Sequence, residues 1–474
     1  MDEGEISAAI KQIEQDHDCF EWTVDGLPIW ERVRFILHRE LQEKVGADQA
    51  HTEPKDNLSQ LTQGVYQWLR NFAFDSPFFA SEHNFLFLGH PRRKEQSDGR
   101  WWDIYCDPIH EEGKLDYVQL EPPFGLTHHT PAKTEQLRYL DSITYTGTLA
   151  RKTLADRLEL DKSLQKAITA VESEIQREVG ATIDLKYIIR AEMAERKATL
   201  PLYTHVLRRI NPDVSVVVVG YLRKTFIEAC KRQNIPVVEL QHGIISENHL
   251  GYSFPNDNNL EFFPDYLFTF GEFWNDNASY PISSERVIAA GYPYLQQQIS
   301  QYNNVKQKPQ ILFISQGTIG SKLSKFAVDV QNDQRLDYNI IYKLHPGEYD
   351  RWESEYPWLV ESDIHVVKDS PSLYKLMAES IAQIGVYSTA IYEGLAFNLK
   401  TFLYDAYGAD GLSHLVEEGA AGWLKSTDDL VEGIDQPRMS LFKKERYFKP
   451  NPIEEIIASL EEIQDLQHNR RFNK

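Results

Sequence analysis

The sequence predicts an α/β protein with two doubly wound domains that face a cleft, preceded by a helical N-terminal segment. Short apolar runs rich in β-branched residues alternate with helical segments from about residue 214 onward. Such alternation is typical of parallel sheets with right-handed crossovers. It occurs as two series, separated by the polar, Gln-rich stretch Gln296–Pro309. At 474 residues the chain is also too long for one hydrophobic core.

Four parts follow from this pattern. We expect a helical extension in residues 1–80, a first doubly wound domain in 81–295, a second in 296–450, and a C-terminal helix in 451–474 that packs back on one of them. In the extension, five apolar residues recur at helical spacing: Ile29, Trp30, Val33, Ile36 and Leu37. This stripe, flanked by Arg32 and Arg34, predicts a helix docked on the core. A helix that binds a membrane surface or an acceptor is the alternative.

The first series begins with a short strand and continues after a helical region. Residues 150–200 are helical and alternate acids with bases, which we interpret as a solvated surface. A helix is expected over Thr225–Gln233. The expected strands are Asn84–Leu88, Val214–Val219, Pro236–Leu240, Asp265–Phe270 and Arg286–Ala290.

The second series repeats the pattern. A helix is expected from about Lys322, and an amphipathic helix over Pro452–Leu466 ends the chain. The expected strands are Ile311–Ser315, Asn339–Leu344, Ile364–Val367, Ile381–Ile384 and Thr401–Tyr404.

Composition excludes several classes of protein. The net charge of -21 argues against a nucleic-acid partner, because such proteins need a basic face. It also disfavours unaided binding to an anionic membrane. The three cysteines are widely spaced, so neither a disulfide framework nor a CxxC metal pattern is expected. The N-terminus lacks the apolar segment of a signal peptide. We expect a cytoplasmic protein without a cofactor, and peripheral association with the inner face of the cell membrane stays open.

In the second series, several residue types suited to an anion follow neighbouring strands. His345 ends a strand beside Pro346, and an imidazole there can donate to a phosphate oxygen. Ser388 and Thr389 begin a helix, whose N-terminus favours an anion. Glu393 follows on that helix and could bind ribose hydroxyls. The combination predicts a nucleotide-sugar site.

Two further candidates belong to the same site. Gly317 and Thr318 lie in a turn directly after a strand, where glycine lets the backbone approach a phosphate closely. Lys343, two residues before the histidine, faces either the helices or the cleft, and strand alternation does not decide between them.

In the first series, Gln241 and His242 follow a strand and open a long polar loop. That loop contains Glu247, His249 and Tyr252, and loops at this edge of a sheet tend to carry function. His242 is either a general base for an acceptor hydroxyl or a donor to phosphates. Glu239, Glu247 and Glu261 are rival bases, and His90 follows the first strand of the series.

No metal site is expected. The single Asp-x-Asp motif, Asp16 and Asp18, lies in the helical N-terminal region rather than after a strand. Zinc, Walker and nucleophile-elbow motifs are also missing from the sequence.

The order of these motifs resembles a known group of enzymes. Strand–QHG, GYP, SQG, KLHP and an STxxxE helix, over about Val214 to Asp405, are similar to surface-polysaccharide glycosyltransferases of the GT-B fold, which has two Rossmann-like domains. The likeness is to the sialyltransferase, Kdo-transferase and glycerophosphotransferase-like group with HP and Ser-Ser/Thr motifs. It implies that His345, Ser388 and Thr389 contact donor phosphates, that Glu393 holds the ribose, and that His242 lies near the acceptor.

We therefore expect a metal-independent glycosyltransferase that acts in capsule or other surface polysaccharide assembly. Its donor would be a CMP- or UDP-linked sugar, bound by the second domain, and its acceptor a glycan or lipid-linked molecule, bound by the first. A nucleotide-sugar 2-epimerase is the nearest alternative, and its characteristic loop would correspond to Gly89–Arg93. A non-catalytic subunit that binds a nucleotide-sugar or glycan is another.

Overall fold

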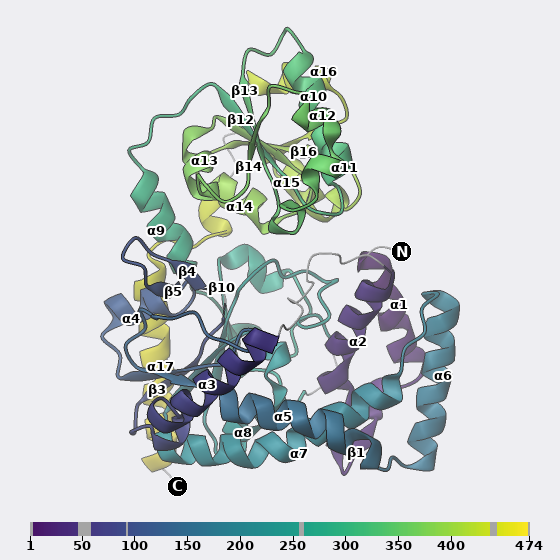
Figure 1. Cartoon of the computed structure of the whole chain (residues 1–474), viewed down its shortest axis with the longest axis vertical. Helices are drawn as coiled ribbons and strands as arrows, with labels where there is room; N and C mark the ends of the chain where they lie inside the picture. Colours follow the sequence, from purple (N-terminus) through teal and green to yellow (C-terminus); the bar gives the residue numbers. More distant parts are fainter. Residues whose placement is uncertain (1–2, 46–57, 92, 256–259, 437–442, 473–474) are drawn as a thin grey trace. The chain divides into compact units, whose positions relative to one another are not determined.

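A computed structural model describes residues 3–45, 58–91, 93–255, 260–436 and 443–472. The chain forms two compact units (Figure 1). Of the described residues, the first contains those up to Pro293 together with those from Asn451 onward, and the second contains those within Tyr294–Pro450. Each unit is built on its own parallel sheet.

The first unit contains a seven-stranded parallel sheet in the order β7-β6-β3-β8-β9-β10-β11. The chain starts in the middle at β3, builds outward to β7, then returns to β8 and builds toward the other edge. This is the doubly wound arrangement, and its switch point lies between β3 and β8. The strands are β3 (Phe85–Leu88), β6 (Tyr117–Glu121), β7 (Leu137–Tyr139), β8 (Val214–Val218), β9 (Val237–Leu240), β10 (Tyr266–Thr269) and β11 (Val287–Ala289).

Helices cover both faces of this sheet. On one face α5 (Asp141–Leu154), α7 (Leu185–Ile210) and α8 (Lys224–Lys231) share a buried apolar cluster with the strands. On the other, α4 (Asp107–Gly113) packs against the C-terminal helix α17 (Pro452–Phe472), as Figure 1 shows. The unit also contains two short antiparallel strand pairs. They are β1 (Thr23–Val24) with β2 (Leu27–Pro28), and β4 (Arg93–Glu95) with β5 (Trp101–Asp103).

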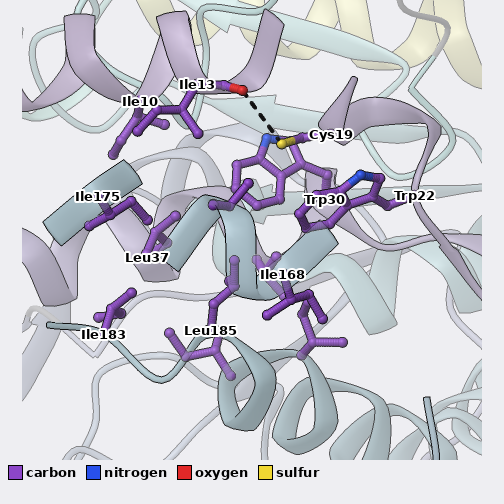
Figure 2. Close-up of a cluster of buried hydrophobic side chains, with 14 of the residues drawn as sticks. Ile10, Ile13, Cys19, Trp22, Trp30, Leu37, Ile168, Ile175, Ile183 and Leu185 are labelled. Atoms are coloured by element: carbon purple, nitrogen blue, oxygen red, sulfur yellow. Dashed lines mark hydrogen bonds between the residues drawn. The ribbon is translucent and has the colours of Figure 1, made fainter. Parts of the chain in front are cut away.

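The N-terminal helices belong to the first unit and share a second apolar core. Helices α1 (Glu3–Asp16) and α2 (Trp30–Val45) pack with α6 (Lys162–Glu178) and the start of α7 (Figure 2). Helix α3 (Leu58–Phe74) packs against α5. The expected stripe on α2 is confirmed as a docking face, because Trp30, Val33 and Leu37 are almost fully buried.

The interpretation of residues 150–200 as a solvated surface is right for the charged face of helix α6, and wrong for its opposite face and for much of α7. Helix α6 buries one whole face, including Ile168 and Val171, in the cluster of Figure 2. Helix α7 is buried even at charged positions, where Arg196 pairs with Glu228 at 2.5 Å. The charge alternation misled because buried ion pairs look like a solvated face in sequence.

The second unit repeats the topology with six parallel strands, in the order β14-β13-β12-β15-β16-β17. Its switch point lies between β12 and β15. The strands are β12 (Gln310–Ile314), β13 (Asn339–Lys343), β14 (His365–Val367), β15 (Ala382–Gly385), β16 (Lys400–Tyr404) and β17 (Ala421–Leu424).

Helices of this unit again lie on both sides of the sheet (Figure 1). One side has α10 (Gly320–Asn332), α12 (Pro357–Val360) and α16 (Thr427–Ile434), and the other α13 (Leu373–Glu379) and α14 (Thr389–Ala396). The short helices α11 (Trp352–Glu355) and α15 (Ser413–Glu417) complete it. The prediction of two doubly wound α/β units is therefore confirmed.

All ten expected strands exist within a residue or two of their expected bounds. Strands β6, β7 and β17 were not expected. The stretch Gln296–Pro309 was expected as a plain connector, but its first half continues helix α9 (Pro293–Tyr302). No helix among the described residues is long and apolar enough to span a bilayer.

Candidate functional site

The switch point of the second sheet brings two loops together. The loop after β12 contains Gln316 and Thr318, and the loop after β15 contains Tyr387. The Gln316 side-chain amide accepts from the Tyr387 N–H at 3.1 Å and donates to the Tyr387 carbonyl. The Thr318 and Tyr387 hydroxyls lie 2.6 Å apart. These bonds fix both loops at the edge where ligands bind in open α/β sheets.

His345 is held by its own backbone environment. It caps a short 3-10 helix, Pro346–Glu348, and its Nδ1 accepts from the Gly347 N–H at 3.1 Å. An imidazole nitrogen that accepts from an N–H carries a lone pair, so the proton of the neutral ring lies on Nε2. His345 therefore presents a hydrogen-bond donor at Nε2.

Glu348 ties three elements together behind this histidine. The residue is fully buried, and its Oε2 accepts from the His345 N–H at 2.8 Å. Its Oε1 accepts from the hydroxyls of Ser315 at 2.9 Å and Tyr356 at 2.7 Å. The carboxylate approaches Gly320 so closely that a Cβ there would lie 2.2 Å from its Oε1. Only glycine fits at that position.

The N-terminus of α14 lies beside the bridged loops. Ser388 is the N-cap, and its hydroxyl accepts from the Ala390 N–H at 3.3 Å. Thr389 is the first helical residue, and Glu393 lies one turn further on, 8% exposed. The free N–H groups and dipole of such a terminus attract an anion.

A cation that the sequence analysis did not single out lies at the same loop. A Cβ at Gly317 would come within 3.2 Å of a guanidinium nitrogen of Arg351. That side chain is held by the Gly347 carbonyl at 3.1 Å and by Glu355 at 3.2 Å. Arg351 thus adds a planar, permanently charged donor to the turn.

The ammonium of Lys343 has local partners. It donates to the Tyr349 hydroxyl at 3.1 Å, to the Leu344 carbonyl at 3.2 Å and to the carbonyl of Lys368. These bonds tie the ends of β13 and β14 together.

In the first unit, three tyrosines surround His242 at the end of β9. The Tyr105 hydroxyl donates to the His242 carbonyl at 3.0 Å. The Tyr221 hydroxyl lies 3.2 Å from Nε2, and the Tyr252 hydroxyl lies 3.2 Å from Nδ1. Both ring nitrogens and the backbone of His242 are therefore oriented by phenol groups.

A buried carboxylate lies behind Tyr252. Glu239 is fully buried, and its Oε1 accepts from the Tyr252 hydroxyl at 2.6 Å and from the Gly220 N–H at 2.8 Å. Burial raises the pKa of Glu239 to about 7, although these two bonds and the nearby Lys224 lower it. A Cβ at Gly220 would lie 2.4 Å from Oε2, so the carboxylate requires glycine there.

Backbone strain marks the same place. Val219 directly follows strand β8 and has φ +63°, a left-handed conformation that β-branched residues rarely adopt. Such strain costs on the order of 1–3 kcal/mol and tends to occur at functional sites. Here the turn aims the Gly220 N–H at Glu239 and places Tyr221 beside His242.

Three other residues expected at the site in the first unit have different surroundings. Gln241 is buried and braces the edge, because its side-chain amide bonds the Phe270 N–H at 2.7 Å and the Gly243 carbonyl at 2.8 Å. The His249 ring stacks on Phe35, and burial together with His242 lowers its pKa to about 3. His90 contacts the Tyr105 ring.

Two of the rival bases lie elsewhere. Glu247 accepts from the hydroxyls of Ser253 at 2.6 Å and Ser279 at 2.9 Å and pairs with Lys11. Glu261 is exposed. In the described structure no hydrogen bond joins either carboxylate to His242, and of the three rivals only Glu239 reaches it, through Tyr252.

The N-terminal helices hold the loop that carries Tyr252. Arg34 on α2 is buried and pairs with Glu14 at 2.7 Å. Its guanidinium donates to the carbonyls of Leu250 at 2.8 Å and Ser253 at 2.7 Å, which flank the tyrosine. Arg34 was expected to flank the apolar stripe of a docked helix, and no motif in the sequence pointed to this second role.

The last residue of the loop Gly89–Arg93 forms ion pairs in the protein interior. Arg93 is buried and pairs with Glu121 at 2.5 Å and Asp107 at 3.5 Å. Burial, followed by the Asp103 charge, raises the pKa of Asp107 to about 7. Arg92 lies outside the described residues.

Sequence reasoning missed Gln316, Tyr387, Arg351 and Tyr221. Gln316 stands inside the SQG motif, and Tyr387 directly precedes Ser388, so their positions next to motifs were a usable signal. Nothing in the sequence pointed to Arg351 or Tyr221, because their roles arise from loop geometry.

Metal ligands do not cluster in the described part of the chain: no group of three or more His, Cys, Asp or Glu side chains there could hold an ion. Asp16 ends helix α1, and Asp18 lies just beyond it with φ +46°.

Comparison with known proteins gives a likeness in fold. Neither a family model nor a curated protein matches the sequence. Among solved structures, the UDP-GlcNAc 2-epimerase from Neisseria meningitidis is 13% identical, with 80% of this chain and 99% of that chain covered and a TM-score of 0.46. The same enzyme from Methanocaldococcus jannaschii is 14% identical over 80% and 99%, with a TM-score of 0.44. The wall teichoic acid polymerase TagF is 12% identical over 88% and 98%, with a TM-score of 0.39. At such identities a likeness in fold does not identify a reaction.

Proposed function

We propose that this protein is a metal-independent glycosyltransferase of the GT-B type. It moves a sugar from a nucleotide-sugar, CMP- or UDP-linked, to a glycan or lipid-linked acceptor in surface polysaccharide or glycoconjugate assembly. The reaction takes place in the cytoplasm, and at the inner face of the cell membrane where the acceptor is lipid-linked.

One observation carries the proposal: three anion-binding features follow the adjacent parallel strands β13, β12 and β15, at the carboxyl edge of the second sheet. They are the His345 Nε2–H donor, the Gly317 turn beside Arg351, and the N-terminus of α14 at Ser388. Together they suit a diphosphate or phosphodiester, and Glu393 further along α14 suits a ribose. Preorganised donors of this kind stabilise the charge that develops on a departing nucleotide.

The first unit supplies the base in this proposal. His242 stands at the carboxyl end of β9, oriented by Tyr221 and Tyr252. A neutral imidazole in this position removes the proton of an acceptor hydroxyl as the sugar is transferred. We extend the sialyltransferase, Kdo-transferase and glycerophosphotransferase-like resemblance to this division of roles.

The epimerase alternative predicts a characteristic loop at Gly89–Arg93. The buried pairing of Arg93 with Glu121 and Asp107 commits that guanidinium to the interior. Epimerisation stays the alternative to transfer, and the need for an acceptor separates the two.

Nucleotide binding is the first experiment. CMP, UDP, GDP and CDP are each added in a thermal-shift series, because a ligand that binds only the folded state stabilises it by about 2.7 kcal/mol at a hundred times its Kd. We expect one of them to raise the melting temperature, and Ser388→Ala to weaken that effect. If none of the four binds, the donor site is wrongly assigned.

Nucleotide release from the matching nucleotide-sugars is the second experiment. A transferase releases nucleotide faster when glycan or lipid-linked acceptors are added, and continues in EDTA. An epimerase interconverts sugars without an acceptor, and a binding subunit releases nothing. Complete loss in EDTA that Mn²⁺ or Mg²⁺ restores would contradict metal independence.

A further inference from the structure

The hydrogen-bond chain behind His242 determines which of its nitrogens carries the proton. The chain runs from the Gly220 N–H through the Glu239 carboxylate and the Tyr252 hydroxyl to His242 Nδ1. Glu239 and Tyr252 are both fully buried, so no water competes from bulk solvent. Each hydrogen in this chain can be placed from the donors and acceptors alone.

The direction of the hydrogen bonds in this chain follows from the Gly220 N–H. A backbone N–H only donates, so Glu239 Oε1 is an acceptor at 2.8 Å. The Tyr252 hydroxyl lies 2.6 Å from the same oxygen and donates to it. The hydroxyl has only one proton, and that proton is now used. Its oxygen must therefore accept from His242 Nδ1, which is 3.2 Å away.

The direction holds when Glu239 is ionised. Its Oε2 is buried and has no hydrogen-bond partner within the described part of the chain. A proton on Oε1 would instead donate to the Tyr252 oxygen and reverse the chain. Burial raises the pKa of Glu239 to about 7, so this direction applies to the ionised carboxylate and is tested well above that pH.

We propose that Glu239 and Tyr252 are positioning residues that keep His242 in the Nδ1–H tautomer, so that Nε2 holds the lone pair and is the basic atom. This proposal rests on the proposed function in one respect only, the identification of His242 as the base. The Tyr221 hydroxyl, 3.2 Å from Nε2, donates to that lone pair when no acceptor is bound. An acceptor hydroxyl replaces it there during transfer.

Three features of the structure hold this hydrogen-bond chain in place. Arg34 fixes the carbonyls on both sides of Tyr252. The strained turn at Val219 delivers the Gly220 N–H, and glycine at position 220 gives the carboxylate room. A Tyr–Glu pair without such fixing would exchange its bonds with solvent and leave the tautomer unset.

The tautomer can be measured without a substrate. In two-bond ¹H–¹⁵N correlation spectra of the full-length protein labelled with ¹⁵N-histidine, protonated and lone-pair ring nitrogens differ in chemical shift. The chain has 15 histidines, so His242 is assigned by the signal lost in His242→Gln. We expect the wild type to show one tautomer, protonated at Nδ1. A wild-type signal protonated at Nε2 would overturn the proposal, whatever the variants do.

Two variants test the residues themselves. Tyr252→Phe keeps the ring and removes the hydroxyl, so we expect the Nε2–H form to appear. Glu239→Gln keeps an acceptor oxygen at Oε1 and should retain the Nδ1–H form. Tyr280→Phe is the matched control, because it removes the hydroxyl of a half-buried tyrosine that donates to the Trp274 carbonyl at 2.5 Å. If Tyr252→Phe leaves the tautomer of the wild type, Tyr252 does not set it.

Turnover measurements on two variants separate this proposal from the proposed function. With a working acceptor, Tyr252→Phe should lower kcat for acceptor-dependent release, by less than the 10²–10⁴-fold that a general base contributes, and leave the donor KM unchanged. If His242→Ala keeps full turnover while the tautomers behave as expected, the role of His242 as base fails and the positioning chain stands. If the spectra do not show the expected tautomers while His242→Ala abolishes turnover, His242 keeps its role as base and the positioning chain is refuted.

Discussion

The buried carboxylate of Glu348 allows a magnitude to be worked out for one substitution, Glu348→Gln. The carboxylate accepts three hydrogen bonds: two hydroxyl groups bind Oε1, and the His345 N–H binds Oε2. A glutamine has the same shape, and its oxygen can keep both hydroxyl bonds. Its amide nitrogen then faces the His345 N–H, so one charge-assisted bond is lost and a buried donor is left without an acceptor.

Such a loss costs about 1–3 kcal/mol. The damage is local to the ends of β12 and β13, since Ser315 and His345 follow these two strands. Hydrogen exchange measured by mass spectrometry on peptides from β12 and β13 is the suitable assay, because it reports local opening. A loss of 1–3 kcal/mol corresponds to roughly fivefold to 150-fold faster exchange where that opening controls it.

Glu353→Gln is the control, because it makes the same substitution at an exposed position of the same unit. Exposed substitutions of this kind usually change stability by less than about 0.5 kcal/mol. If Glu348→Gln exchanged like the wild type and like Glu353→Gln, the carboxylate would not hold these loops, and the account of how His345 is positioned would be wrong.

Three further predictions concern the site. His345→Ala should keep the fold, checked by circular dichroism, and lower turnover roughly a hundredfold to a thousandfold, as the loss of one charge-stabilising donor does; unchanged turnover would remove His345 from the site. His242→Ala should slow acceptor-dependent nucleotide release while nucleotide affinity, measured by calorimetry, stays near wild type; loss of that affinity would place donor binding in the first unit. Glu239→Gln should flatten the pH dependence of urea unfolding between about pH 4.5 and 7. Burial raises the Glu239 pKa from 4.5 to about 7, so its contribution is present below pH 4.5 and lost as the pH rises through 7. That contribution is about 3 kcal/mol, and identical pH slopes in both proteins would refute it.

The sequence was sufficient to locate strands whose residues are apolar on both faces. Strand β8 has valine at four of its five positions, and β12 is apolar at four of five, because both lie in the middle of their sheets. Strand β6 was not predicted because it contains Gln119 and Glu121. Both are buried, and their side chains hydrogen-bond to Asp103 and Arg93, respectively. Buried polar networks leave no periodic pattern, so only coordinates reveal such a strand.

The same limit applies to the site. His345 and Ser388 were predictable because a strand end or a helix cap is a local property of the sequence. Tyr221 and Arg351 were not, since each reaches its place through a turn whose geometry no short motif records. The strained φ of Val219 is the clearest case, because a β-branched residue there argues against the conformation that it adopts.

The two histidines are held in opposite protonation patterns by similar means. In the first unit, the Tyr252 oxygen accepts from His242 Nδ1, which leaves a lone pair on Nε2. In the second, the Gly347 N–H donates to His345 Nδ1, which leaves a proton on Nε2. A buried glutamate stands behind each arrangement, Glu239 in one unit and Glu348 in the other. A group transfer from a nucleotide needs a base at the acceptor and a donor at the leaving phosphate. In the transfer that we propose, a lone pair at His242 and a proton at His345 would meet those two needs without any proton transfer beforehand. The same histidine spectra test this directly, because His242 and His345 should show opposite tautomers in the absence of any ligand.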